Sequence, residues 1–366
     1  MLPVTVLGQA KSASWASRQF NKFFNDTTSS AEKSFRVYPT LGYSPETGVE
    51  PGASALWLFR ARGDSTNRLS EVQTFAFFTF KAQFGLWIDN AIYGDKDKWF
   101  FLGRTRIQRF PLLYYGIGNN TSGDHPAVVD ANYILLRQRV LRKIKPNLFL
   151  GPEVDFQHLF GVAFNQPEGG PAHTLPIGSS GTTNLGVGAA LVYDDRHNVL
   201  NVRKGWFGEI GYLGYTPSLG SDYRFSSVNV EVRAFHPIAR NNVLAWQVLG
   251  NFMQGDIPFN QLALMGGEMM MRGYYQGRYR DKNMLAAQVE YRLLPFTFSK
   301  RLGATLFAGT ATVAPTVSAF RLDRVQFAGG AGLRYLLFKK KDIYIRLDMG
   351  LTKEGPGFYF FTGEAF

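Results

Sequence analysis

The chain has 366 residues, no cysteine, and a formal net charge of +12 with a pI near 9.7. The missing cysteine excludes disulfides, thiol nucleophiles and cysteine metal sites. The charge invites a nucleic-acid partner, but basic residues alternate singly with apolar ones, as in RTRIQRF at 104–110, instead of clustering. Scattered charge of this kind argues against nucleic-acid binding.

Hydropathy and composition point to a particular kind of membrane protein. The mean hydropathy is −0.13, and no apolar run approaches the roughly 18 residues of a membrane-spanning helix. The chain nevertheless holds 32 Phe, 17 Tyr and 39 Gly. Aromatic and glycine enrichment with weak local hydrophobicity is typical of a membrane β-barrel.

The first residues read like the end of a secretory signal. MLPVTVLGQA has a short apolar stretch followed by small residues, with cleavage expected after Ala10. An ordinary mature N-terminus is the alternative. Residues 14–30 are expected to form a partly ordered leader, with a periplasmic plug or interfacial helix as the other option. We therefore predict a signal remnant and short periplasmic leader over 1–33, and a barrel over 34–366.

From Ser34 onwards, apolar and polar residues alternate with a period of two. In the stretch 284–294, Leu285, Val289 and Leu293 share one face, and Gln288, Glu290 and Arg292 share the other. Alternation alone does not separate a soluble sandwich from a barrel. The predicted strands are long, however, with about 10–14 residues, as bilayer-spanning strands need to be.

The connections between these strands fall into two length classes. The short ones are expected at 44–48, 142–147, 198–205 and 338–342, and the long ones at 114–130, 165–183 and 257–282. Outer-membrane barrels carry short periplasmic turns and long external loops. We therefore predict an all-β fold: a closed antiparallel transmembrane barrel of about sixteen strands, with a long loop between strands 11 and 12.

The predicted last strand, 357–366, alternates aromatic residues and ends in Phe366. A terminal Phe is a sorting signature of outer-membrane proteins, and a merely apolar final strand is the alternative. Both interpretations agree with the bacterial outer membrane as the location.

No enzyme motif is recognisable. The five histidines are isolated, no phosphate-binding loop or G-x-S-x-G elbow occurs, and no metal-ligand spacing is found. Asp194 and Asp195 are interpreted as a turn with ion pairs to Arg196 and Arg203. A Ser–His pair formed only by folding stays open. We predict no enzyme, no catalytic residue, no metal and no cofactor.

One long segment carries a family resemblance. GGEMMMRGYYQGRYRDKNMLAAQVEYRLLPF at 266–296 resembles the sixth loop and following strand of BamA/TamA-type barrels, the bacterial surface antigen family. The matching stretches elsewhere are 110–120, 192–212, 329–335 and 345–351, so the resemblance spans nearly the whole barrel. Such proteins insert or translocate proteins at outer membranes.

The resemblance implies a role for this loop. It is expected to fold into the lumen, with Arg272 docked on the inner wall against Glu290 and with Gly273 turning the backbone tightly. The remaining motif residues are Gly267, Tyr274, Arg280 and Asp281. An external loop with solvated arginines is the alternative, and it would return little for the entropy lost on ordering.

Two departures from the family pattern stand out. The family places a second aspartate on the next strand, but Gly309 occupies that position here, so the Arg272 contact is expected to be weaker or to reach elsewhere. The family also carries periplasmic POTRA domains, and fewer than thirty-five residues precede the barrel. A partner protein is therefore expected to supply the periplasmic domain.

The leading functional hypothesis is outer-membrane protein assembly or export through a weak seam between the first and last strands. The seam residues are expected to be Phe35, Val37, Tyr38, Phe360 and Phe366, and Pro39 cannot donate to a ladder. A pore or transporter, and a structural subunit without insertase activity, are the alternatives. Expected partners are outer-membrane lipids or lipopolysaccharide, unfolded client proteins and a periplasmic or outer-membrane partner.

Overall fold

The computed structural model describes residues 34–80, 82–109, 111–197, 200–339 and 341–366. The predicted signal remnant and leader, residues 1–33, lie outside the described residues. Within these ranges nearly all regular structure is β. The strands are β1 (Ser34–Ser44), β2 (Gly48–Arg60), β3 (Leu69–Phe78), β4 (Phe84–Tyr93), β5 (Trp99–Arg109), β6 (Leu112–Tyr114), β7 (Ala127–Lys145), β8 (Leu148–Asn165), β9 (Thr182–Asp194), β10 (Gly205–Tyr215), β11 (Phe225–Ala239), β12 (Asn242–Gly255), β13 (Ala263–Met265), β14 (Tyr279–Asp281), β15 (Asn283–Leu293), β16 (Leu302–Ala314), β17 (Gln326–Phe338), β18 (Ile343–Thr352) and β19 (Gly355–Thr362).

Short 3-10 turns occupy some of the connections. They are η1 (Ala61–Gly63), η2 (Asp95–Asp97), η3 (Pro217–Leu219), η4 (Val317–Ala319) and η5 (Leu322–Arg324). Among the residues that the structure describes, no helix is long and apolar enough to span a bilayer.

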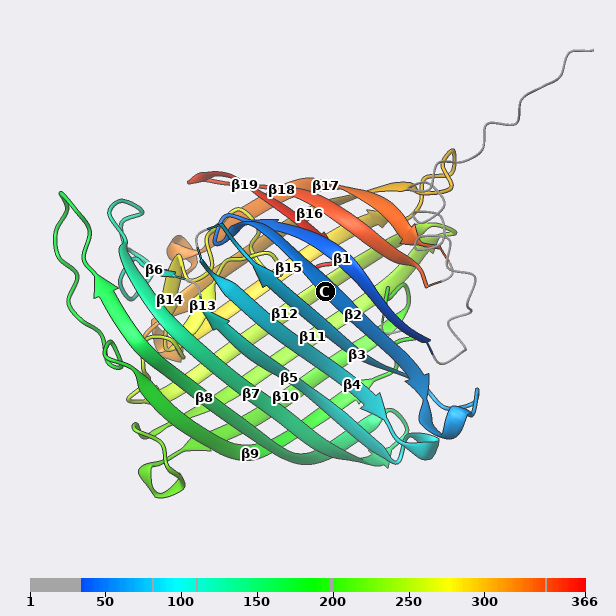
Figure 1. Cartoon of the computed structure of the whole chain (residues 1–366), viewed down its shortest axis with the longest axis horizontal. Coiled ribbons are helices and arrows are strands. Elements are labelled where there is room, and N and C mark those ends of the chain that lie inside the picture. The colour runs from blue at the N-terminus through cyan, green and yellow to red at the C-terminus, as the bar shows by residue number, and fades with distance from the viewer. Residues whose placement is uncertain (1–33, 81, 110, 198–199, 340) are drawn as a thin grey trace, which may run out of the picture.

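Seventeen of these strands form one closed antiparallel barrel in which the strands are strongly tilted (Figure 1), and β13 and β14 form a separate two-stranded sheet within the connection between β12 and β15. Each strand pairs with its neighbour in the chain, β6 continues β5 along β7, and β1 meets β19 to close the sheet. Counting β5 and β6 as one strand gives a barrel of sixteen strands, which confirms the prediction. In this count β12 is the eleventh barrel strand and β15 the twelfth, so the connection 256–282, called the sixth loop below, lies where the strand count placed the long loop.

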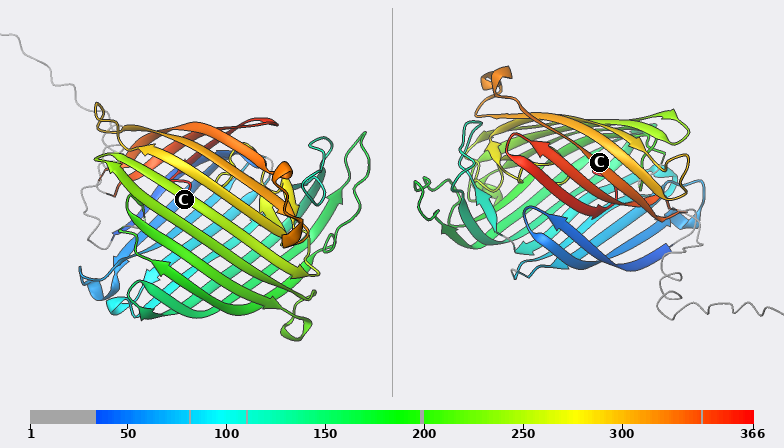
Figure 2. Two further views of the ribbon diagram at one scale, coloured as in Figure 1. Left: turned by 180° about the vertical axis from the view of Figure 1, so that it is seen from behind. Right: turned by 90° about the horizontal axis from the view of Figure 1, so that it is seen from above.

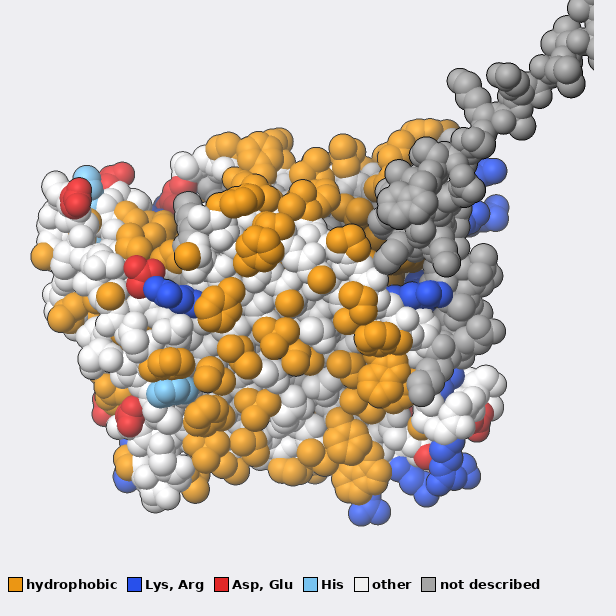
Figure 3. Space-filling view, viewed as in Figure 1, with side chains coloured by type: hydrophobic (Ala, Val, Ile, Leu, Met, Phe, Trp, Pro, Cys, Tyr) orange, Lys and Arg blue, Asp and Glu red, His pale blue; other side chains and the backbone are white. Residues whose placement is uncertain are grey.

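Alternation along each strand separates lipid from lumen. On β17, Phe327, Leu333 and Tyr335 are exposed on the outside, whereas Gln326 and Arg334 are buried on the inside. On the face drawn in Figure 3, hydrophobic side chains cover much of the wall between the two ends of the barrel. Because side chains alternate with a period of two, the polar face predicted for 284–294, with Gln288, Glu290 and Arg292, points inwards.

The connections sort by end as predicted, with one exception. The long connections 115–126, 166–181 and 256–282 share one end, called the long-loop end, and the turns 146–147 and 339–342 lie at the opposite, short-turn end. The short turn 45–47 was expected with the short turns, but it lies at the long-loop end. Strand parity, not loop length, fixes the end, since every antiparallel strand reverses direction.

The last strand ends earlier than predicted. β19 stops at Thr362, and Gly363, with φ of +95°, turns the chain inwards. Phe366 therefore lies inside the barrel near Phe235 on β11, where Arg292 donates to its backbone oxygen over 2.9 Å. The prediction that Phe366 belongs to the seam strand is wrong, because a buried apolar niche on the far wall holds its ring.

Candidate functional site

Arg272, in the sixth loop, is the centre of a buried ion cluster. Only 1% of the residue is exposed, and its guanidinium bridges two strands. Nη2 donates to Glu290 on β15, and Nη1 donates to Oδ2 of Asp348 on β18 over 2.6 Å. The loop therefore folds into the lumen and connects β15 to β18, which are separated by two other barrel strands.

The carboxylates of this cluster are shared with wall arginines. Glu290 also accepts from Arg292 (2.7 Å), and Asp348 accepts from Arg334 (2.5 Å) and Arg346 (3.1 Å). All these side chains are at most 2% exposed. Buried charges are expensive unless they are paired in good geometry. Each guanidinium here has a carboxylate, and the pairs form one network rather than separate bridges.

The ring of Phe307 completes the Arg272 pocket. The guanidinium carbon lies over the ring, 3.6 Å from its centroid. A flat, weakly hydrated guanidinium stacks on an aromatic face in a way that a lysine ammonium does not. The pocket is thus shaped for arginine and not merely for a positive charge.

Gly273 lets the loop backbone press against β18 and β19. Its φ is +110°, and its N–H donates to the hydroxyl of Tyr359 over 2.9 Å. A Cβ at this position would lie 2.6 Å from Thr352 Cγ2, and a Cβ on Gly350 would lie 2.3 Å from the Arg272 oxygen. Two glycines are therefore needed for this approach.

The rest of the loop tip packs on itself and on the inner wall. Tyr274 is 1% exposed and meets Tyr279 edge-to-face at 5.9 Å. Gly267, at φ +108°, donates its N–H to the Tyr274 oxygen over 3.0 Å. A Cβ on Gly309 would lie 3.3 Å from the sulfur of Met271, so the missing family aspartate leaves its space to the methionine.

Arg280 and Asp281 lie away from the Arg272 cluster. Arg280 donates to the Leu113 oxygen (2.7 Å) and accepts from the Gly118 N–H (2.8 Å), which joins the sixth loop to the connection 115–126. Asp281 accepts from the neighbouring Lys282 N–H over 2.8 Å. Arg280 therefore holds the loop to the long-loop end of the barrel, whereas the Asp281 carboxylate bonds to the next residue of the chain.

Two further anchors reach the turns beside the seam. Arg278 pairs with Glu354, in the β18–β19 turn, over 2.8 Å. The Gln276 N–H donates to Glu46, in the β1–β2 turn, over 2.8 Å. The sixth loop therefore contacts both sides of the junction at which the barrel closes.

That junction is the weakest ladder in the barrel. β1 and β19 share one register pair, Tyr43 with Phe360. Figure 2, in its right-hand view, shows the blue and red strands facing each other across this seam. Of the other predicted seam residues, Phe35 and Val37 are outward-facing and exposed, whereas Tyr38 points inwards and is buried.

Side chains hold the short-turn half of the seam. The Tyr38 ring lies 5.5 Å from Phe338 at the end of β17, and the Lys341 ammonium donates to the Ser34 hydroxyl over 2.8 Å. These contacts bridge the gap that β19 leaves when it ends at Thr362.

A segment from the opposite wall crosses the short-turn mouth. Residues 200–203, in the β9–β10 connection, form this crossing segment. Leu200 packs on the cluster of Tyr38 and Phe338. Arg203, predicted to pair with Asp194 or Asp195, instead holds Asp342 with two hydrogen bonds of 2.6 and 2.9 Å. Asp194 pairs with Arg196, as predicted.

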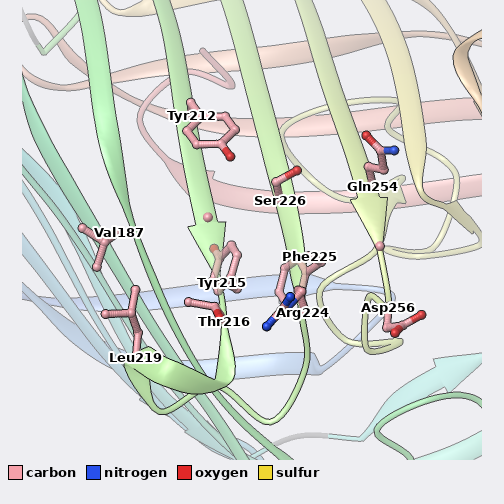
Figure 4. A pocket seen from close by; sticks show the side chains of 12 residues that line it. Val187, Tyr212, Tyr215, Thr216, Leu219, Arg224, Phe225, Ser226, Gln254 and Asp256 are labelled. Carbon is pink, nitrogen blue, oxygen red and sulfur yellow. The ribbon is translucent and has the colours of Figure 1, made fainter.

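The described residues hold no evident cofactor site. Among the described residues, no group of three or more His, Asp or Glu is arranged to hold a metal. A shallow, open pocket at the long-loop end lies between β10, β11 and β12, and its charged residues are Arg224 and Asp256 (Figure 4). Asp256 is the first residue of the sixth loop, but none of the lining residues belongs to the Arg272 cluster.

Sequence reasoning missed Asp348, the second carboxylate. The family pattern places that residue at the position of Gly309 on β16. Here β18 supplies it instead, from the stretch 345–351 that already matches the family. The signal was present, since Arg346 and Asp348 share the polar face of this strand and Gly350 follows two residues later. Only the fold brings that strand to Arg272.

Comparisons with known proteins agree with this architecture. A family model described as the Omp85 superfamily domain matches residues 156–366, more than half of the chain. No curated protein matches the chain in sequence.

Solved structures share the fold at low identity. BamA from Haemophilus ducreyi lacking POTRA domains 1–3 is 12% identical, with a TM-score of 0.57, covering 90% of this chain and 70% of that one. CdiB from Escherichia coli is 10% identical, with a TM-score of 0.55 and coverage of 94% and 69%. CdiB from Acinetobacter baumannii is 10% identical, with a TM-score of 0.53 and coverage of 90% and 65%.

Proposed function

Because this chain belongs to the Omp85 superfamily, we propose that it inserts client β-barrel proteins into the outer membrane through its β1–β19 seam. The chain is a multi-pass β-barrel of the bacterial outer membrane, and its family works in outer-membrane protein assembly or secretion. Family members are insertases or translocators and not known enzymes. That this chain inserts proteins rather than secreting them, and that it does so with the clients and partners named here, is our proposal.

The single observation that carries this proposal is the unequal pairing of β1. Eleven register pairs join it to β2, and one joins it to β19. Among the described residues, the stretches 34–35 and 37–42 of β1 therefore have no strand partner on the seam side. An exposed edge recruits an extended chain by backbone hydrogen bonding, so a client strand can add to β1.

The docked sixth loop supports this role by holding the other side of the seam. Arg272 fixes β15 to β18, and Gly273 contacts Tyr359 on β19. When the seam opens, β18 and β19 then stay attached to the inner wall while β1 accepts the client. A periplasmic partner that delivers unfolded clients fits this scheme, as does a lipid surface around the wall.

Passage through the lumen is the second candidate. Arg104 is exposed on the inner face and lies directly opposite Arg137 on the neighbouring strand, a like-charge pair of the kind that lines polar conduits. Against it, the sixth loop and the crossing segment occupy the two mouths. Ion conductance of the reconstituted barrel tests this candidate.

Reconstitution tests the proposed function. Liposomes holding the full chain are expected to accelerate insertion of an unfolded barrel protein over empty liposomes. Arg272→Ala removes the tie between β15 and β18 and is expected to lose the acceleration, whereas Arg321→Ala, in an exposed pair with Asp323, keeps it. Equal insertion rates with and without the chain would contradict an insertase that works alone.

A further inference from the structure

Unpaired cations gather at one corner of the short-turn end. The β4–β5 connection and the end of β7 carry four exposed basic residues that form no ion pair with a carboxylate among the described residues: Lys96, Lys98, Arg142 and Lys145. Of the nearby acids, Asp95 pairs with Arg62 (3.3 Å) and Asp97 with Lys143 (3.9 Å), and the exposed Asp64 accepts two hydrogen bonds from Thr66. Figure 3 shows blue side chains gathered at the barrel end where Figure 1 places the β2–β3 and β4–β5 connections.

Hydrogen bonds hold this corner in one arrangement. Asn67, 3% exposed, donates to the Ala61 oxygen (3.0 Å) and accepts from the Lys96 N–H (2.8 Å). The Lys143 N–H donates to the Lys98 oxygen over 3.0 Å. The β2–β3 and β4–β5 connections and the end of β7 are therefore joined to one another, so the backbone positions that carry these cations are fixed relative to one another.

Trp99 gives the height of the corner relative to the bilayer. It begins β5 on the outer face, is 44% exposed, and is the register partner of Arg142, whose guanidinium lies 6.0 Å from its ring. The wall next to it is apolar, with Phe101 and Val140 exposed. Interfacial tryptophans sit at headgroup level, so Arg142 stands where lipid phosphates lie.

We propose that Lys96, Lys98, Arg142 and Lys145, with Trp99, form a binding site for the phosphate headgroup of an anionic phospholipid in the periplasmic leaflet. Short turns face the periplasm. Guanidinium and ammonium groups donate charge-assisted hydrogen bonds to phosphate oxygens, and the acyl chains would lie along Phe101 and Val140. An acidic protein is less suited, because Arg142 and Trp99 stand on the lipid-facing wall. The inference is independent of insertase activity.

Tryptophan quenching in vesicles tests the proposal. The full chain is reconstituted in phosphatidylcholine vesicles that contain brominated phosphatidylglycerol or, in parallel, brominated phosphatidylcholine. The chain has six tryptophans, so the signal of Trp99 is the difference between wild type and Trp99→Phe. We expect the brominated anionic lipid to quench that signal at an at least about fivefold lower mole fraction, which corresponds to about 1 kcal/mol.

Variants and competition decide the outcome. Lys98→Gln/Arg142→Gln/Lys145→Gln is expected to remove the preference, and Arg321→Gln/Arg324→Gln, at the opposite end, to keep it. Equal quenching by both lipids, or a preference that survives the triple variant, overturns the proposal and leaves an acidic protein as the ligand for these cations. Loss of the preference to inorganic phosphate at constant ionic strength would show a free-phosphate site and also overturn it.

Discussion

The two edges of β1 belong to the same eleven residues but are paired very differently. Towards β2 the ladder runs along the whole strand, and towards β19 it consists of Tyr43 and Phe360. The cause lies in the neighbour, because β19 has eight residues and the chain then turns inwards at Gly363. The barrel is therefore closed there by side chains, which can separate without unravelling a ladder.

What replaces the ladder differs between the two halves of the seam. In the long-loop half, the sixth loop holds β18 and β19 through Arg272 and Gly273 and reaches Glu46 beside β1. In the short-turn half, an apolar cluster around Tyr38 and Phe338 holds the two sides of the seam together. Separating a buried ion pair leaves uncompensated charges in the interior and costs much free energy. Separating an apolar cluster leaves no such charges, so the cost is smaller. We expect the short-turn half to open first.

The largest effect is expected from Arg272→Ala. Removing the guanidinium leaves Glu290 and Asp348 buried with less positive charge, which costs about 3–5 kcal/mol of folding free energy. Urea titration of the protein folded into lipid vesicles measures this. Arg321→Ala, whose pair with Asp323 is about 60% exposed, is expected to change stability by less than about 1 kcal/mol. Similar values for the two variants would show that the loop is not held by this cluster.

A smaller effect is expected from Tyr38→Ala. The ring is 3% exposed and packs on Phe338, so its loss should cost about 3 kcal/mol through a cavity at the seam. Phe35→Ala on the same strand is the matched control, because that ring faces lipid and is 64% exposed. The same urea titration applies. If both variants lose equal stability, the inner side chains do not close this half.

The smallest effect concerns Glu46. Burial, reinforced by the charge of Glu268, raises the pKa of Glu46 from 4.5 to about 7. A raised carboxyl pKa means that folding favours the protonated form, so its contribution to stability is largest below pH 4.5 and is lost as pH rises to about 7. The Glu46→Gln variant has no carboxyl group at this position, so its stability lacks this pH dependence.

The variant should therefore match wild type in acid and gain about 1–2 kcal/mol over it at neutral pH. Melting temperatures in detergent across this range report the difference. A gap that widens on acidification would mean that the charged carboxylate, through its bond from Gln276, stabilises the loop contact.

The architecture could be read from the sequence, because period-two alternation and strand length are local properties. The number of barrel strands, sixteen, and the position of the sixth loop followed from these two properties. The pair of Arg272 and Glu290 needed the family resemblance, since the two residues are eighteen positions apart across a loop. Asp348 and the inward path of Phe366 were missed because both depend on which distant strands the closed barrel brings together. The end at which the 45–47 turn lies was missed because loop length is a weaker guide than strand parity.

The most direct test of the account is to lock the seam. Tyr43 and Phe360 are register partners on the outer face, and the chain has no cysteine, so Tyr43→Cys/Phe360→Cys places the only thiols there. Val37→Cys/Ala55→Cys, register partners between β1 and β2, is the matched control. In the liposome insertion assay we predict that oxidation stops client insertion by the seam variant, that reduction restores it, and that the control works in both states. Undiminished insertion by a barrel with a fully oxidised seam would contradict the account.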